Sequence, residues 1–180
     1  MTEVTPVPVP AWIIRVARLR VTAGFCVAVA AFWLARPTWL SLGVGATVAL
    51  VGESMRVWAA GHLEKGLEVT TSGPYRWMRH PLYVGSSLLG AGFAAASRHP
   101  VAAALVVVYL AVSLQVAARL EEATLRVKFG DAYDRYVRGV AKSSSRPFSA
   151  GRARRNGEAQ AVLGVLAALA ILGMKVWLAD

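Results

Sequence analysis

Five apolar runs, each long enough or nearly long enough to cross a lipid bilayer, constrain this chain more than any other feature. The cleanest run, residues 101–118, holds 18 consecutive uncharged residues. The other four are residues 12–35, 39–60, 82–96 and 159–178. A transmembrane helix needs about 20 predominantly apolar residues, within a range of roughly 17–25. The chain is therefore expected to fold within a membrane.

The runs are expected to be helices rather than strands. None of them alternates between apolar and polar residues, and only helices and closed barrels satisfy their backbone groups in lipid. The composition agrees, because 56% of the residues are hydrophobic and 17% are charged, whereas soluble domains carry about 25% charged residues. We therefore predict an all-α polytopic membrane protein with about five transmembrane helices.

A cytosolic helical extension is predicted after the fourth run. The helix is expected to continue to about Phe129 and to end at Gly130, because glycine commonly follows the last helical residue. Asp131 is expected to cap a short second helix. Residues 143–145 and 151–157 are rich in Ser, Gly and Arg and are predicted to be loop or linker.

Basic residues lie between the apolar runs and predict the orientation of the chain. Residues 119–155 hold ten Lys or Arg against four acidic residues, and the formal net charge is +10. Because cytoplasmic loops are enriched in Lys and Arg, we expect residues 61–80 and 119–157 to lie in the cytosol. The N-terminus is expected there too, since three arginines stand near the start of the first run: Arg15, Arg18 and Arg20. Five spans then leave the C-terminus outside.

This orientation gives the two long polar segments one shared face, where they can build a single site. The expected location is the inner membrane of a bacterium, with the active site on the cytosolic side. Nucleic-acid binding is disfavoured as an explanation of the basic charge, because the apolar runs need a bilayer. No metal site is expected, since the chain has one cysteine and its histidines (His62, His80 and His99) are not spaced as a cluster.

The segment before the third run combines several residues suited to a ligand site. Pro81 fits the first position of a helix, where its missing N–H costs nothing, and His80 is steered away from helical dihedrals by the proline that follows. The free N–H groups of such a helix start favour an anion. Gly85 lets a ligand or another helix approach closely. The competing interpretation is an interfacial aromatic belt of Tyr75, Trp77 and Tyr83.

Two groups of charged residues stand at the ends of apolar runs. Glu121 and Glu122 follow the fourth run, where Glu122 can pair along the helix with Arg126 or one carboxylate can bind a hydroxyl or amino group. Glu53 and Arg56 lie three residues apart in the second run, so an ion pair is the default expectation. Ionisable residues within a span are also candidate site residues, and Arg56 is suited to an anionic group of a substrate.

Taken together, these motifs resemble the isoprenylcysteine carboxyl methyltransferase and phospholipid methyltransferase superfamily. The resemblance covers roughly residues 50–148. It rests on Gly52-x-x-x-Arg56, Gly73-Pro74-Tyr75-Arg76, Arg79-His80-Pro81-x-Tyr83-x-Gly85, Glu121-Glu122 and Phe129-Gly130-x-x-Tyr133-x-x-Tyr136. The order Ser145-Arg146-Pro147-Phe148 departs from the family pattern, in which a basic or aromatic residue and Phe-x-Pro follow the last tyrosine.

The resemblance implies a membrane methyltransferase that uses S-adenosylmethionine. The residues expected to surround this cofactor are Tyr75, Arg79, His80, Pro81, Tyr83, Gly85, Glu121 and Glu122, and the expected catalytic residues are Arg79 and Arg56. The methyl acceptor is lipid-like, and its nucleophile stays open among a prenyl-cysteine carboxylate, a phospholipid amine and a thiol. Two alternatives of other classes are a reductase related to NADPH-dependent sterol reductases, disfavoured because Ser86 follows Gly85 where those enzymes have an acidic residue, and a non-catalytic membrane scaffold.

The last apolar run is expected to be an addition to this enzyme core. We divide the chain into a membrane-embedded methyltransferase core, residues 1–157, and a C-terminal transmembrane helix, residues 158–180. Small residues along that helix (Gly164, Ala168 and Gly173) permit close helix packing or formation of a homodimer. The helix is expected to act as a structural strut or to form a wall of the opening through which the substrate enters from the bilayer.

Overall fold

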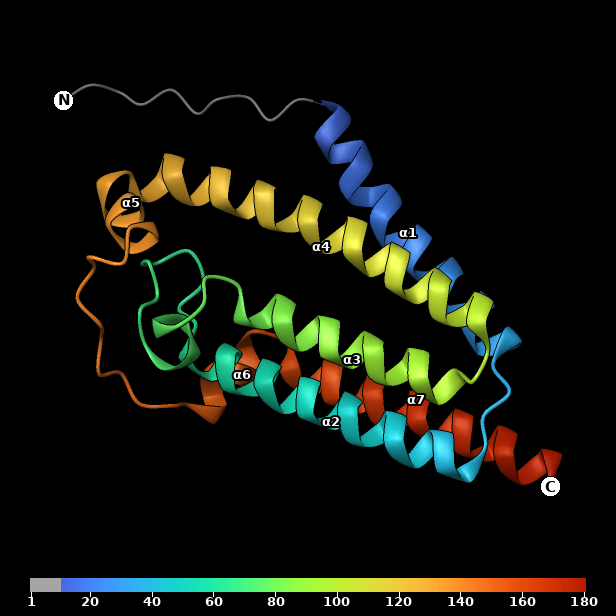
Figure 1. Ribbon diagram of the computed structural model, residues 1–180. Coiled ribbons are helices and arrows are strands. Elements are labelled where there is room, and N and C mark those ends of the chain that lie inside the picture. The colour runs from blue at the N-terminus through green and yellow to red at the C-terminus, as the bar shows by residue number, and fades with distance from the viewer. Residues whose placement is uncertain (1–10) are drawn as a thin grey trace.

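The computed structural model describes the backbone of residues 11–180 and the side chains of residues 19–180. Every regular element in this part of the chain is helical, which confirms the all-α class (Figure 1). The elements in chain order are α1 (Ala11–Leu34), α2 (Trp39–His62), the 3₁₀ helix η1 (Gly73–Arg76), α3 (Pro81–Ser97), α4 (Pro100–Phe129), α5 (Asp131–Val137), α6 (Ala150–Arg155) and α7 (Glu158–Ala179). The side chains of Arg15 and Arg18 lie outside the described residues.

Three of the five expected spans are long and apolar enough to cross a membrane by length and composition: α2, α4 and α7. The described part of α1 that is apolar, Leu19–Leu34, is shorter, and α3 has 17 residues. Helix α4 has 30 residues, which corresponds to about 45 Å against a hydrocarbon core of about 30 Å. Residues 119–129 of α4 therefore extend beyond the span formed by residues 101–118.

The predicted ends of the extension are partly confirmed. Gly130 ends α4 with a positive φ of 46°, as its lack of a side chain allows. Gly130 also precedes α5, and Asp131 is the first helical residue of α5 rather than its cap. The segment predicted as linker contains α6, because the Ser149 hydroxyl accepts a hydrogen bond from the Arg152 N–H and so caps a short helix.

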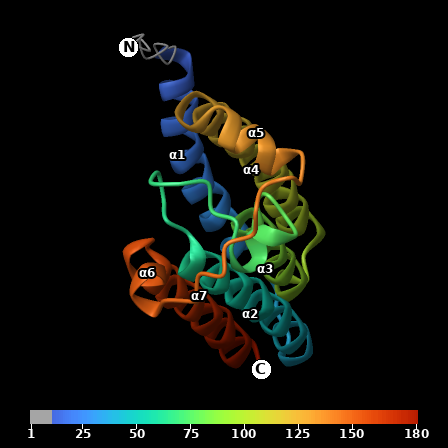
Figure 2. The ribbon, with the colours of Figure 1, turned by 90° about the vertical axis from the view of Figure 1, so that its left-hand side faces the viewer.

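Helices α2 and α3 form the closest pair in the bundle, and glycines make this possible. A Cβ atom added to Gly52 would lie 2.6 Å from the carbonyl oxygen of Gly85, and one added to Gly92 would lie 2.6 Å from that of Gly45. Small residues let helix backbones approach in membranes, where hydrophobic burial does not drive association. Helix α3 also packs on α4, while α7 lies along α2 and α1 along α4 (Figures 1 and 2).

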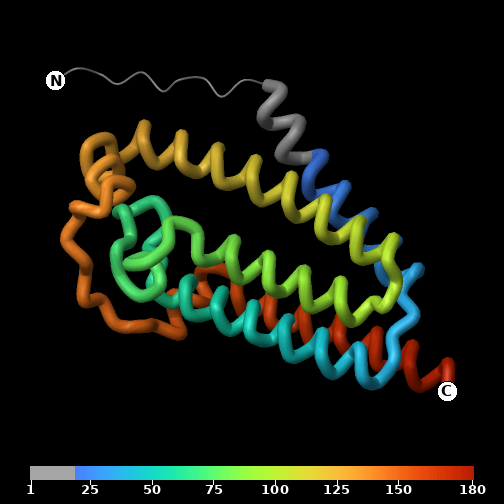
Figure 3. The backbone as a smooth tube through the Cα atoms, viewed as in Figure 1, coloured from blue at the N-terminus to red at the C-terminus, as the bar shows by residue number. Residues whose placement is uncertain are grey.

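The loop between α2 and α3 lies at the same end of the bundle as α5 and α6 (Figure 3). The two polar segments are joined there by ion pairs between Glu64 and Arg152 (3.1 Å) and between Glu68 and Arg146 (2.8 Å). Sequence segments separated by about eighty residues thus form one face, as predicted.

Helix α7 contacts the end of α1, at the end of the bundle opposite to the polar loops. The Lys175 ammonium donates hydrogen bonds to the carbonyl oxygens of Phe32 (2.7 Å), Trp33 (3.1 Å) and Ala35 (2.7 Å). These carbonyls lie where α1 ends, and a helix leaves its last carbonyls without partners within the helix. Lys175 of α7 therefore caps α1.

Candidate functional site

The start of α3 has the geometry that its sequence predicts. His80 is non-helical, with φ −127° and ψ 60°, and Pro81 is the first helical residue. Because the backbone turns into the helix at this point, Arg79 and His80 precede the first turn and Tyr83 lies within it. All three side chains contact the extension of α4.

These side chains contact the two carboxylates of α4, Glu121 and Glu122. The Tyr83 hydroxyl donates to Glu121 Oε2 at 2.6 Å, while His80 Nε2 lies 3.0 Å and Arg79 Nη1 3.3 Å from Glu122 Oε1. The rings of His80 and Tyr83 stack with centroids 5.3 Å apart. Residues separated by about forty positions in the sequence thus form one cluster, which we call the α3–α4 cluster: Arg79, His80, Tyr83, Glu121 and Glu122.

One interpretation of the sequence paired Glu122 with Arg126 along α4. The structure instead pairs Glu122 with residues outside α4. Its partners are Arg79 and His80, whereas Arg126 lies 3.7 Å from Asp134 of α5. The sequence alone could not distinguish these pairings, because the spacing of three or four residues describes only neighbours on the same helix.

The carboxylates and the imidazole shift one another's proton affinity. Glu121, followed by Glu122, raises the pKa of His80 above its usual value, against the burial that lowers it. In return, the interaction with His80 lowers the pKa of both carboxyls. A carboxylate near an imidazole favours the charged form of each. The cluster therefore holds ionised carboxylates beside a readily protonated histidine.

A cavity of about 520 Å³ lies beside this cluster, at the polar end of the bundle. Four of the predicted site residues line it: Tyr75, Arg79, Tyr83 and Glu121. Further lining residues, which the sequence analysis did not assign to the site, include Lys65, Thr124, Lys128, Phe129, Tyr133, Tyr136 and Asn156. The cavity thus combines aromatic rings, two lysines, an arginine and two carboxylates, those of Glu68 and Glu121.

Helix α5 closes the cavity through its two tyrosines. The Tyr136 hydroxyl donates to the carbonyl oxygens of Tyr75 (2.9 Å) and Met78 (3.3 Å), and burial raises the pKa of Tyr136 to about 12. Tyr133 is almost fully buried. The sequence did carry a signal for these residues, since both follow Gly130 at a spacing of three and so share one face of a helix.

The remaining predicted residues do not line the cavity. Pro81 is buried at the start of α3, and His80 and Glu122 support the lining residues from the α3–α4 cluster. Gly85 faces α2, because an added Cβ would lie 2.7 Å from Arg56 Cγ. Of the two reasons for a glycine at position 85, the close approach of a helix is the one observed.

Arg56 lies in a separate, buried group of charges between α2, α3 and α7. Its guanidinium contacts Glu158 (3.0 and 3.1 Å), Glu53 (3.3 Å) and the Ser86 hydroxyl (2.6 Å). The expected pair with Glu53 is present, but Glu158 was missed because it meets Arg56 across 102 positions of the sequence. We call Glu53, Arg56 and Glu158 the buried triad.

Asn156 was also missed, because it lies in the segment predicted as linker. Its side-chain amide donates to the carbonyl oxygens of Ala60 and Leu63, each at 2.9 Å. These carbonyls belong to the end of α2, so Asn156 joins the start of α7 to the end of α2 beside the cavity. Nothing in the local sequence distinguishes this asparagine from a solvated loop residue.

Comparison with known proteins assigns the family. The model of the phospholipid methyltransferase family matches residues 19–132, which is more than half of the chain, and the chain therefore belongs to this family. The match includes Arg56, the α3 motif and both carboxylates of α4, and it ends before α6 and α7.

One curated relative is the nickel-cobalt-cadmium resistance protein NccN of Alcaligenes xylosoxydans xylosoxydans, which is 32% identical over 109 residues. The aligned part covers 56% of this chain and 49% of NccN, so the chain spans about half the length of that relative. No solved structure is significantly similar to the chain.

Proposed function

We propose that this chain is an integral membrane methyltransferase that transfers a methyl group from S-adenosylmethionine to a lipid-like acceptor in the cavity beside the α3–α4 cluster. Membership of the phospholipid methyltransferase family supports the reaction class. The observation that carries the proposal is the cavity itself, because it gathers Tyr75, Arg79, Tyr83 and Glu121 from η1, α3, α4 and the segment before α3. Its volume of about 520 Å³ lies within the range of roughly 300–1,000 Å³ typical of ligand sites.

The lining residues fit the chemistry of this cofactor. Arg79 and the two lysines, Lys65 and Lys128, suit a carboxylate, and the ionised Glu121 suits a ribose hydroxyl or an amino group. The aromatic face of Tyr75, which lines the cavity, suits a sulfonium cation. When bound, S-adenosylmethionine supplies an already activated methyl group.

The chain's own contribution is then alignment of the donor and the acceptor. Tyr83 holds the carboxylate of Glu121, and the hydrogen bonds of Tyr136 hold α5 against the α2–α3 loop, so the lining is fixed before ligands bind. Correct placement of two reactants can lower the activation barrier by about 7–11 kcal/mol. We therefore assign Arg79 to the binding of charged groups in the cavity. Arg56, outside the cavity lining, is assigned to the packing of α2, α3 and α7.

The cavity is proposed to face the cytosol, because the surrounding loops carry most of the basic residues. Reporter fusions at residues 68 and 145 test this orientation, and both are expected to report a cytosolic location. Opposite locations of the two sites would contradict a single shared face.

The reaction is tested with purified protein and methyl-labelled S-adenosylmethionine. Three acceptors are offered in the same detergent: phosphatidylethanolamine, a prenylated cysteine and a long-chain alkanethiol. Transfer to at least one acceptor is expected, and the family description favours the phospholipid amine. Calorimetry with S-adenosylmethionine alone separates an enzyme, which must bind it, from a scaffold, which need not.

A further inference from the structure

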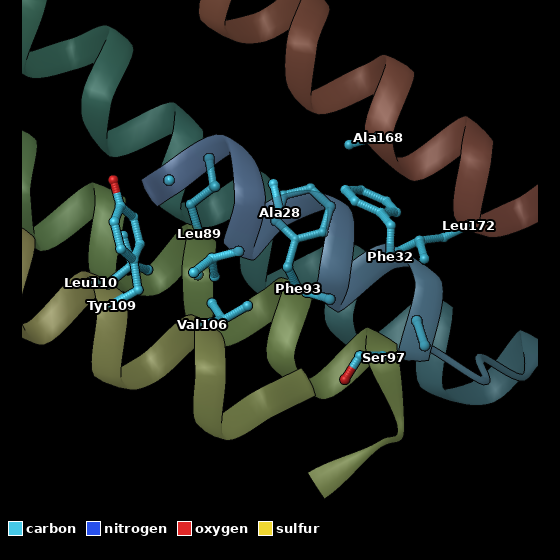
Figure 4. Close-up of a pocket in the computed structure, with 15 residues that line it drawn as sticks. Ala28, Phe32, Leu89, Phe93, Ser97, Val106, Tyr109, Leu110, Ala168 and Leu172 are labelled. Atoms are coloured by element: carbon cyan, nitrogen blue, oxygen red, sulfur yellow. The ribbon is translucent and has the colours of Figure 1, made fainter. Parts of the chain in front are cut away.

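A second cavity, of about 230 Å³, lies within the membrane-spanning part of the bundle. Figure 4 shows it between α1, α3, α4 and α7, with Phe32 and Phe93 pointing into it. Helix α7 contributes Ala168 and Leu172. We call this cavity the intramembrane pocket.

The polar groups at this pocket are already satisfied. The Tyr109 hydroxyl donates to the carbonyl oxygen of Arg20 at 3.0 Å, and the Ser97 hydroxyl donates to that of Ala94 at 2.7 Å. No other side chain that lines the pocket carries a polar atom. Because both hydroxyl protons are engaged and the rest of the lining side chains are apolar, the pocket suits an apolar ligand.

A hydrocarbon chain is the ligand that the surroundings provide. Apolar cavities of about 150 Å³ exclude water and take up small hydrocarbons, and the intramembrane pocket is larger. Its lining atoms would lack dispersion contacts if nothing filled it. Ala28 of α1, which lines the pocket, is also exposed, so the pocket is accessible from the side of the bilayer.

The pocket continues the helix faces that line the polar cavity. On α3, Tyr83 lines the polar cavity and Gly90, seven residues later, lines the pocket. On α4, Leu110 lines the pocket and Thr124, fourteen residues later, lines the polar cavity. Residues seven apart lie on nearly the same face of a helix, and these spacings correspond to about 10 and 21 Å. One half of a hydrocarbon core, about 15 Å, falls between them.

We propose that the intramembrane pocket binds the distal part of the acceptor's hydrocarbon chain while the acceptor's headgroup occupies the polar cavity. This inference rests on the proposed function. Lipid chains are as apolar as the pocket, so the pocket selects its ligand by length and shape and not by polarity. Helix α7, which lies outside the family match, supplies one wall and thereby determines which chain lengths fit.

The experiment fills the pocket from two sides. Ala168→Phe places a ring into it from α7 and Ala28→Phe does so from α1, so the test does not depend on the folding of one variant. Ala167→Phe is the matched control, since Ala167 is exposed on the same helix and does not line the pocket. The probe is a single-chain phosphoethanolamine lipid with a palmitoyl chain that ends in a photoreactive diazirine.

In the parent protein, crosslinks are expected on residues 89–97 of α3 and 168–172 of α7. Either filling variant is expected to reduce them by roughly fivefold or more, because overpacking removes the space for the chain, whereas Ala167→Phe leaves them unchanged. In the methyl-transfer assay, the filling variants are expected to methylate palmitoyl acceptors more slowly than the parent protein does. Their rate with decanoyl acceptors is expected to stay unchanged.

Two results would overturn the inference. One is labelling that avoids these residues while palmitoyl acceptors are still methylated in the filling variants. The other is equal labelling by a photoreactive alcohol with the same chain and no phosphoethanolamine, which would mean that the pocket takes any chain of the bilayer. Failure of the proposed function looks different: no acceptor would be methylated, although headgroup-dependent labelling of the pocket could persist and would support the binding site.

Discussion

The α3–α4 cluster and the buried triad are both groups of carboxylates held by an arginine, yet they differ in exposure and setting. In the triad, the side chains of Glu53 and Glu158 are each 6% exposed, and the group joins three helices without lining the polar cavity. In the α3–α4 cluster, Glu121 is 43% exposed and lines the cavity. The α3–α4 cluster is therefore the stronger candidate for a ligand site, because it borders a cavity that a ligand can enter.

The first and largest expected effect comes from removing the only cation of the triad. Arg56→Ala leaves two buried carboxylates without a partner, and breaking a buried ion pair costs about 3–5 kcal/mol. Thermal unfolding in detergent is expected to show this loss of stability, whereas Arg56→Lys, which keeps the charge, is expected to lose less. A loss below about 1 kcal/mol for Arg56→Ala would contradict the structural role of the triad.

Removal of Glu121 is expected to affect ligand binding more than stability. Glu121→Ala deletes a charged acceptor in the cavity, and hydrogen bonds to charged groups contribute about 1.5–3 kcal/mol. Calorimetry should therefore show S-adenosylmethionine binding weakened by roughly 10- to 100-fold. Asp131→Asn, an exposed acid on α5 outside the cavity, serves as the control. Equal affinities of parent and Glu121→Ala would refute the assignment of the cavity.

A smaller effect is expected from pH through His80. Its pKa is raised in the folded protein, so the stabilisation is fully present below the usual histidine pKa of about 6.5 and is lost as pH rises through the raised value. The stability difference between the parent and His80→Gln should thus shrink as pH increases from mildly acidic to alkaline. Because these ion pairs are partly exposed, the stability difference between the parent and His80→Gln should be about 1 kcal/mol or less. A difference that grows with pH would contradict the contacts of His80 with the two carboxylates.

The smallest effect is expected at Glu53. The triad holds two carboxylates and one guanidinium, and both Glu53 oxygens are buried without a hydrogen-bond donor. Glu53→Gln keeps the size of the side chain while Arg56 keeps its hydrogen bonds to Glu158, so stability should change by less than about 1 kcal/mol. Unfolding of Glu158→Gln provides the comparison, because that change removes the hydrogen-bonded partner and should cost more. The reverse order would show that Glu53 is the main partner of Arg56.

The sequence predicts what local physics determines. The apolar runs give the helix bounds to within two residues except at the end of α4, which was predicted from Gly130, and proline geometry places the start of α3 at Pro81. The positive φ at the end of α4 required Gly130. Tyr75, Arg79, Tyr83 and Glu121 could be named as a group, although that step rested on resemblance to a family and not on spacing.

The missed features depend on contacts between distant parts of the chain. Glu158 meets Arg56 across 102 positions, and Asn156 reaches the end of α2 across more than ninety. Neither residue has a local pattern that separates it from a surface residue. The role of Gly85 was left open for the same reason, because only the position of α2 shows which neighbour approaches it.

The cap that Lys175 places on the end of α1 has a consequence for biosynthesis. A ribosome delivers α1 before α7, so the carbonyls at the end of α1 stay without this donor until α7 has been made. A product truncated before α7 would lack this cap, the Glu158 partner of Arg56 and one wall of the intramembrane pocket. The end of α1 is thus capped only in molecules that contain α7.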